Sequence, residues 1–168
     1  GRRWSSSWVR QLLAEGRVEE VAEVLGRPYR LVGVVQHGEK RGRRLGFPTA
    51  NLDAGPGVLA PADGVYAGWL VRDVPGHDEA QEFLPAAISV GTNPQFDGAV
   101  RTVEAHVLGR DDLDLYGQEV AVVFIKRLRG MQKFDDVEDL LAQMDEDLRQ
   151  TAATLGVRAA TRAAPKPA

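Results

Sequence analysis

Apolar residues follow a helical spacing near both ends of the chain and a strand-like spacing between them. Residues 6–25 carry two short apolar stripes separated by Gly16, which predicts a helical hairpin. From Leu31 onward the apolar residues form short runs, and clusters of Gly, Pro, Asp and Asn separate these runs. The runs span residues 31–36, 65–71, 84–90, 100–108 and 119–128. So many strands without helices between them favour an antiparallel barrel, because closure leaves no exposed sheet edge.

The last regular pattern is again helical and begins at Asp135 or Asp136, either of which can cap a helix start. The apolar residues that then recur at helical spacing are Val137, Leu140, Leu141, Met144, Leu148 and Leu155. We expect this helix to lie against the barrel with its apolar stripe inward. Residues 158–168 are small, basic and proline-bearing, with nothing to bury, so we expect a disordered tail.

Composition narrows the class of protein. The chain has 168 residues, enough for one domain, and 43% of them are hydrophobic, enough for a core. It contains no cysteine, which excludes disulfides and thiolate metal sites and suits a cytoplasmic protein. No apolar run approaches the roughly 20 residues that a membrane span needs. With 21 basic and 24 acidic side chains, the net charge of −3 disfavours nucleic acid and anionic lipid as partners.

A basic, glycine-rich stretch at residues 42–51 follows the first strand-like run. Glycines let the backbone approach an anion closely, and arginines neutralise its charge. The hydroxyl of Thr49 and the amide oxygen of Asn51 are two residues apart on an extended segment, so they point the same way and could share one Mg²⁺. No Gly-Lys-Ser/Thr closes the loop, which is therefore not a Walker P-loop. On composition alone, a solvated turn that leads into a strand is the better interpretation.

Reading outward from this loop, a series of short motifs follows in a fixed order. They are GVVQHG at 33–38, GRRLGFPTAN at 42–51, ADGVYAG at 62–68, ISVGTNP at 88–94, VEAHV at 103–107, DLYG at 114–117, and Leu128-Arg129 followed by Phe134-Asp135. In this order they resemble riboflavin kinase, specifically the kinase module at the C-terminal end of bacterial bifunctional FAD synthetases. The similarity covers residues 31–154.

The resemblance implies a mainly β fold: a closed antiparallel, Greek-key-like, six-stranded β-barrel with a C-terminal helix and a short N-terminal helical segment. Residues 4–10 resemble the signature that closes the adenylyltransferase domain of the same enzymes, and residues 26–29 resemble the linker after it. We therefore expect residues 1–29 to be a helical segment and linker left from that domain. We expect the kinase domain at 30–157 and the tail at 158–168.

The rest of an adenylyltransferase domain is not recognisable in the chain, which begins with Gly-Arg-Arg rather than Met. The His-x-Gly-His element of that domain is absent, since the histidines are His37, His77 and His106. We therefore expect a fragment of a longer protein, without its adenylyltransferase domain and without FMN adenylylation activity.

Glu104 is the candidate catalytic base. It lies on the polar face of an alternating strand, where a carboxylate is unfavourable for strand formation. By its residue type alone it fits a surface glutamate paired with Arg101 or Lys126. The resemblance implies that Glu104 accepts the proton of the ribityl 5′-hydroxyl as that oxygen attacks the γ-phosphorus of ATP. His106, on the same face, fits a hydrogen-bonded structural histidine.

The resemblance also implies three sets of binding residues. Thr49 and Asn51 would hold Mg²⁺. The residues implied for ATP are Gly38, Arg43, Thr49, Asn51, Val107 and Tyr116, and those for the flavin are Arg129, Gln132 and Phe134. By residue type alone, Phe134 equally fits a hydrophobic staple ahead of the last helix.

The activity implied is ATP-dependent phosphorylation of riboflavin to FMN with Mg²⁺, which makes riboflavin and ATP the small-molecule partners. One alternative is a barrel that binds flavin and nucleotide without turnover. Another is a small barrel that grips single-stranded nucleic acid through Arg41, Arg43 and Arg44. Only 7% of the residues are aromatic, which disfavours this last alternative because such modules stack bases on aromatic side chains.

Overall fold

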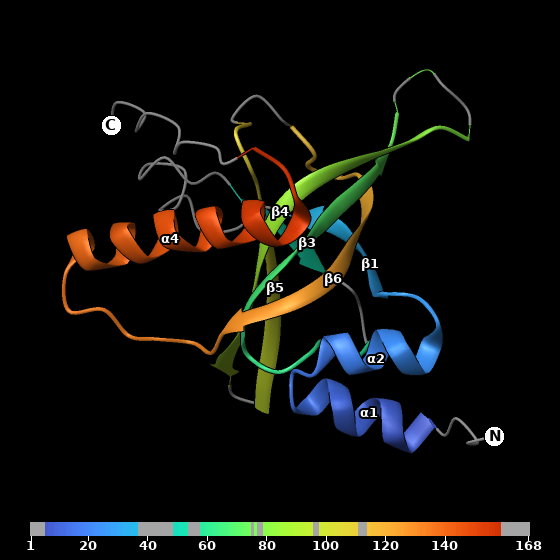
Figure 1. Cartoon of the computed structure of the whole chain (residues 1–168), viewed down its shortest axis with the longest axis horizontal. Coiled ribbons are helices and arrows are strands. Elements are labelled where there is room, and N and C mark those ends of the chain that lie inside the picture. The colour runs from blue at the N-terminus through green and yellow to red at the C-terminus, as the bar shows by residue number, and fades with distance from the viewer. Residues whose placement is uncertain are drawn as a thin grey trace.

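The computed structural model describes residues 6–36, 49–53, 58–74, 76, 79–95, 98–110 and 114–158. Six antiparallel strands close into a barrel in the order β1-β2-β5-β4-β3-β6 (Figure 1). The strands are β1 Tyr29–Gln36, β2 Ala50–Asp53, β3 Gly64–Asp73, β4 Gln81–Gln95, β5 Gly98–Val107 and β6 Glu119–Arg129. Strands β3, β4 and β5 are paired in sequence, whereas β2 lies beside β5, as in a Greek key. The predicted six-stranded barrel is confirmed.

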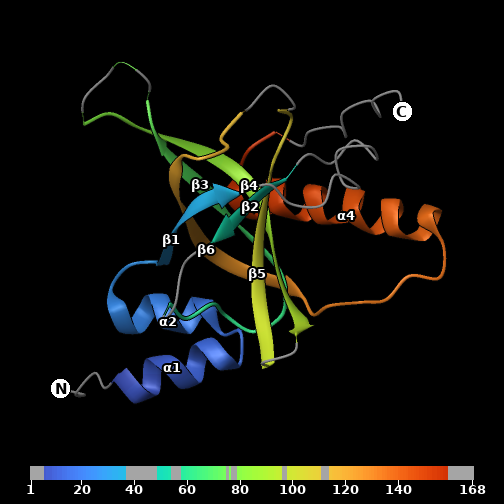
Figure 2. The same ribbon diagram turned by 180° about the vertical axis from the view of Figure 1, so that it is seen from behind.

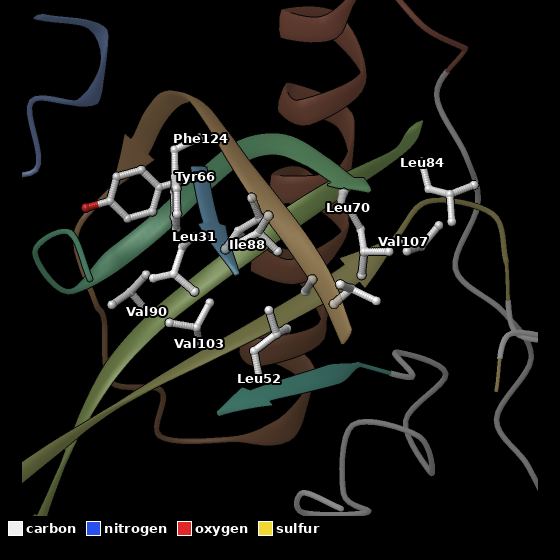
Figure 3. Packing of buried hydrophobic residues seen from close by; sticks show 14 of the residues in the cluster. Leu31, Leu52, Tyr66, Leu70, Leu84, Ile88, Val90, Val103, Val107 and Phe124 are labelled. Carbon is white, nitrogen blue, oxygen red and sulfur yellow. The ribbon is translucent and has the colours of Figure 1, made fainter. Parts of the chain in front are cut away.

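The barrel interior is filled by alternate residues of each strand. In β1, Leu31 and Val35 are buried while Val32 and Val34 are exposed, as a strand with one solvated face requires. Figure 3 shows how side chains from all six strands meet inside the barrel. They include Leu31, Leu52, Tyr66, Leu70, Leu84, Ile88, Val90, Val103, Val107 and Phe124. This shared interior fixes which residues face outward, and Asn51 and Glu104 of the candidate site are among them.

Gly68 allows β3 and β6 to approach each other closely. A Cβ atom at this position would lie 1.9 Å from the carbonyl oxygen of Val123 and 2.7 Å from Cδ1 of Ile88. The register between the two strands shifts between Ala67 and Gly68, which marks a β-bulge. Only glycine fits this crossing without displacing backbone.

The C-terminal helix α4, Val137–Leu155, packs on the outer face of β3, β4 and β6. Its cap is Asp136, one of the two caps that the sequence offered, and its carboxylate accepts a hydrogen bond from the backbone N–H of Asp139 at 2.8 Å. Leu148 is buried against the barrel, but Val137 is 41% exposed, so the prediction of an inward stripe is wrong for the first turn. The reason is visible in Figure 1, where the first half of α4 extends past the barrel.

The N-terminal helices α1, Ser6–Ala14, and α2, Val18–Leu25, form the predicted hairpin and pack on the barrel (Figure 1). Val18 is 1% exposed and belongs to the barrel core. The carbonyl of Leu13 accepts a hydrogen bond from the backbone N–H of Ala62 at 2.9 Å. The two helices are therefore part of the folded unit. The boundaries predicted at 29/30 and 157/158 stay predictions, and residues 159–168 of the predicted tail lie outside the described residues.

The segment that leads into β3 is held by side chains from four strands. Each of its successive carbonyls, from residue 59 to residue 63, accepts a hydrogen bond. The donors are Tyr29 Oη to Leu59 (2.6 Å), Arg101 Nη1 to Ala60 and Pro61 (both 2.8 Å), Tyr66 Oη to Ala62, and Arg127 Nη2 to Asp63 (2.7 Å). The backbone acceptors of this segment are thus satisfied by side chains, although it has no regular secondary structure.

Candidate active site

One row of directly opposite residues crosses all six strands on the outer surface of the barrel. In order from β1 to β6, this outer row consists of Gln36, Asn51, Glu104, Ser89, Val65 and Arg129. Directly opposite residues of antiparallel strands project their side chains from the same face. Leu52, beside Asn51, and Val103, beside Glu104, are buried in the core, so the row itself faces outward. The outer row therefore orders the outward side chains around the barrel.

Asn51 and Glu104 are immediate neighbours in the outer row. Their Cα atoms are partners in the β2–β5 register, which places the Cβ atoms about 4.5–5.5 Å apart. Thr49 precedes β2 and is exposed. Figure 2 shows the side of the barrel formed by β1, β2 and β5. The predicted base and the predicted metal ligand Asn51 thus share one face of the sheet, although their strands are far apart in the sequence.

Tyr116 lies next to the end of the barrel where the outer row begins. The N–H of Gly117 donates to the carbonyl of Val35 at 2.8 Å, and the N–H of Val35 donates to the carbonyl of Gln118 at 2.9 Å. These bonds fix the turn beside the last residues of β1. Tyr116 is 56% exposed there, while Val107 is in the core at the same barrel end.

Two further residues predicted to bind ATP, Gly38 and Arg43, belong to the segment 37–48, which lies outside the described residues. Of the residues that the resemblance implies for ATP, the structure therefore describes Thr49, Asn51, Val107 and Tyr116.

Arg129 occupies the other end of the outer row and is bound by α4. Its Nε and Nη2 donate to the two carboxylate oxygens of Asp147 at 2.8 Å each, and its Nη1 donates to the carbonyl of Gly130 at 3.0 Å. The Asp147 side chain is 7% exposed and also accepts from Gln143 Nε2 at 3.0 Å. Since a guanidinium carries five N–H donors, these bonds leave Arg129 with further donors for a ligand.

The other predicted flavin residues, Gln132 and Phe134, lie on the connection from β6 to α4. Gln132 is exposed and Phe134 is half-buried. This connection runs away from the barrel to the far end of α4 (Figures 1 and 2). The structure therefore brings Asn51 and Glu104 together on adjacent strands, whereas Gln132 and Phe134 belong to this connection.

Comparison with known proteins decides the family. The family model for riboflavin kinase matches residues 25–155. The chain belongs to the riboflavin kinase family. The resemblance seen in the sequence motifs is confirmed, and the match includes the whole barrel and α4.

The relatives agree with this membership. The bifunctional riboflavin kinase/FMN adenylyltransferase of Escherichia coli (strain K12) is 38% identical over 147 residues, which is 88% of this chain and 44% of that protein. The riboflavin kinase of Trypanosoma brucei has a TM-score of 0.59 at 30% identity, over 77% of this chain and 80% of that one. A Streptococcus pneumoniae structure named macrolide-efflux protein has a TM-score of 0.78 at 36% identity, over 89% of this chain and 46% of that one. The chain spans less than half the length of the curated relatives it matches.

The oxygen donors of this riboflavin kinase family member suit a metal that is shared with a nucleotide. Within the described ranges, no three acidic or histidine side chains gather to hold an ion by themselves. Thr49 and Asn51 offer neutral oxygens, and both are accessible. Mg²⁺ in phosphoryl-transfer enzymes commonly takes one or two protein ligands and completes its shell with phosphate oxygens and water. The donor set therefore fits a phosphate-bound divalent cation. None of the described helices is both long and apolar enough to span a membrane.

Sequence reasoning missed two residues of this region, Ser89 and Asp147. Ser89 lies directly opposite Glu104, between the core residues Ile88 and Val90. The feature of the sequence that could have pointed to Ser89 was a hydroxyl side chain within an apolar run. Asp147 lies beside Leu148 on the buried face of α4, and its signal was a carboxylate at a buried helical position.

Proposed function

We propose that this chain transfers the γ-phosphoryl group of ATP to the 5′-hydroxyl of riboflavin, giving FMN and ADP. Membership of the riboflavin kinase family supports the reaction. The observation that carries the assignment of residues is the pairing of Asn51 with Glu104 on adjacent strands. The proposal concerns the kinase reaction alone, because the chain spans 44% of its E. coli relative.

Phosphoryl transfer requires in-line positioning of the two reactants and stabilisation of charge on the phosphoryl oxygens. In the proposed site, Glu104 accepts the proton of the 5′-hydroxyl as the oxygen attacks the γ-phosphorus. Thr49 and Asn51 hold the divalent cation, which we take to be Mg²⁺ and which when bound neutralises phosphate charge. Glu104 next to Asn51 puts the base beside the phosphate that the nucleotide presents.

The outer row suggests which end of the site each substrate occupies. The nucleotide occupies the end formed by Gln36 and the Tyr116 turn, with its γ-phosphate at Asn51. In-line attack places the incoming oxygen on the side of the phosphorus opposite to the leaving ADP. The alcohol therefore arrives from the side of Ser89 and α4, with Arg129 of the outer row beyond it.

The test is turnover by the purified chain. Incubation with riboflavin, ATP and Mg²⁺ should yield FMN, resolved from riboflavin by chromatography. Glu104→Gln should lower kcat by about 10²–10⁴-fold, the usual contribution of a general base. Its structure and its affinity for riboflavin should be preserved, because glutamine has the same shape.

Three results separate the possibilities. Wild-type turnover that Glu104→Gln abolishes supports the proposal. Flavin binding without FMN formation by the wild type would show a binding module instead. FMN formation at an equal rate by both proteins would remove Glu104 from the mechanism while leaving the reaction in place.

A further inference from the structure

Ser89 lies beside the proposed catalytic base and on the path of the acceptor alcohol. It is the direct partner of Glu104 in β5 and of Val65 in β3. Its neighbours Ile88 and Val90 are fully buried in the barrel, so the Ser89 hydroxyl projects outward. The side chain is half-buried. It is therefore held in place and still accessible to a ligand.

Ser89 marks the border between the open part of the outer row and the part that α4 covers. Ala87, two residues earlier on the same face, packs against Leu148 and Ala152 of α4. Val65, the next residue of the outer row, is 6% exposed. A chain that extends from Glu104 toward α4 therefore passes Ser89 before it reaches residues that are already buried.

When the 5′-hydroxyl of the acceptor lies at Glu104, the part of the acceptor chain next to this hydroxyl must lie over β4. Neighbouring strands are about 4.8 Å apart, so the next strand along the outer row is a few bonds away from the reacting oxygen. In riboflavin those bonds belong to the ribityl chain, which carries secondary hydroxyls. The outward polar side chain of the outer row on β4 is Ser89.

We propose that Ser89 is a specificity-determining residue whose hydroxyl binds a secondary hydroxyl of the acceptor's polyol chain. This inference rests on the proposed function. It makes the polyol chain, as well as the terminal alcohol, a recognised part of the substrate. An acceptor without secondary hydroxyls leaves the half-buried Ser89 hydroxyl without that partner, which costs affinity.

The experiment compares riboflavin with a flavin whose N10 carries a plain 5-hydroxypentyl chain. Ser89→Ala should lower kcat/KM for riboflavin about threefold to tenfold, the range expected for one neutral hydrogen bond. It should leave kcat/KM for the hydroxypentyl flavin unchanged. Ser89→Thr, which keeps a hydroxyl, should recover most of the loss with riboflavin.

The matched control is Thr102→Val, which removes a hydroxyl two residues from Glu104. Thr102 shares the outer face of β5 with Glu104 but lies opposite Gly91, outside the outer row. This variant should treat the two flavins as the wild type does. An effect of Thr102→Val that equals that of Ser89→Ala would show that the hydroxyl's position in the row is irrelevant and would overturn the proposal.

A second readout separates this inference from the proposed function. Both flavins are fluorescent, so titration with the protein gives a Kd for each without turnover. Ser89→Ala should weaken riboflavin binding and leave hydroxypentyl flavin binding unchanged. An equal loss for both flavins, or no loss for either, overturns the role of Ser89. Failure of the proposed function appears separately, as a wild-type chain that makes no FMN.

Discussion

The ion pair between Arg129 and Asp147 should be the most costly single contact to remove between α4 and the barrel. Asp147 is 5% exposed and accepts three hydrogen bonds, two from Arg129 and one from Gln143. Asp147→Asn keeps the shape of the side chain but removes its charge and turns one oxygen acceptor into a donor facing Arg129. The guanidinium then stays partly buried with only one of its two bonds to the helix.

The magnitude follows from the burial of both partners. Breaking a fully buried ion pair by removing one partner costs about 3–5 kcal/mol, because the other charge is left uncompensated. The Arg129 side chain is 20% exposed, so water can solvate part of it, and asparagine still accepts one bond. We therefore expect a loss of about 2 kcal/mol in the free energy of unfolding.

Urea unfolding followed by circular dichroism measures this loss. The matched control is Glu146→Gln, the same change of charge and size at the adjacent residue of the same helix. Glu146 pairs with Arg149, whose side chain is 71% exposed, and solvent screens such a pair. This control should leave the urea midpoint unchanged. Equal midpoints for Asp147→Asn, Glu146→Gln and the wild type would refute the reasoning, since the buried pair would then contribute no more than an exposed one.

Two further predictions concern the barrel. Gly68→Ala should lower the free energy of unfolding, measured in urea, by about 3 kcal/mol or more, because its Cβ would lie 1.9 Å from the backbone oxygen of Val123. The control is Gly91→Ala, since the atom nearest to a Cβ at Gly91 is 3.5 Å away. Equal stability of the two variants would contradict the argument. Burial raises the pKa of Tyr66 and of Tyr29, so the folded state holds these protons more tightly than the unfolded state does. Stability should therefore fall as pH rises above about 10. Tyr66→Phe should make urea midpoints between pH 9 and pH 11 less pH-dependent, and an unchanged slope would exclude Tyr66 as a source.

Features set by neighbouring residues were predictable from the sequence. The cap at Asp136 depends on a side chain and an N–H three residues apart. The outward direction of Glu104 depends on the two-residue alternation of its own strand. The short strand β2, by contrast, gave no apolar run, because only Leu52 of its four residues is fully buried. Its place in the barrel depends on its neighbours β1 and β5.

The contacts of α4 with the barrel were not predictable from the sequence. The resemblance implied Arg129 as a flavin contact, and this interpretation did not include a partner on α4. The pairing with Asp147 depends on how α4 lies across β3, β4 and β6, which the amphipathic pattern of the helix does not specify. The same reason explains why Val137 is exposed. The spacing of apolar residues predicts an apolar stripe along the helix, but the position of the helix decides which turns of that stripe contact the barrel.

Barrel geometry explains how one row of residues can serve two substrates. The outer row begins at Gln36, the last residue of β1, and ends at Arg129, the last residue of β6. These strands are antiparallel neighbours, with Val34 opposite Glu119 and Tyr29 opposite Phe124, so their last residues lie at opposite ends of the barrel. Strands in a closed barrel are tilted relative to the barrel axis, so a row of directly opposite residues runs from one end of the barrel to the other. In the proposed site, this displacement along the axis separates the nucleotide end, bounded by the Tyr116 turn, from the α4 end. Substitutions on the face of α4 that packs on the barrel should accordingly change affinity for the flavin and leave affinity for ATP unchanged.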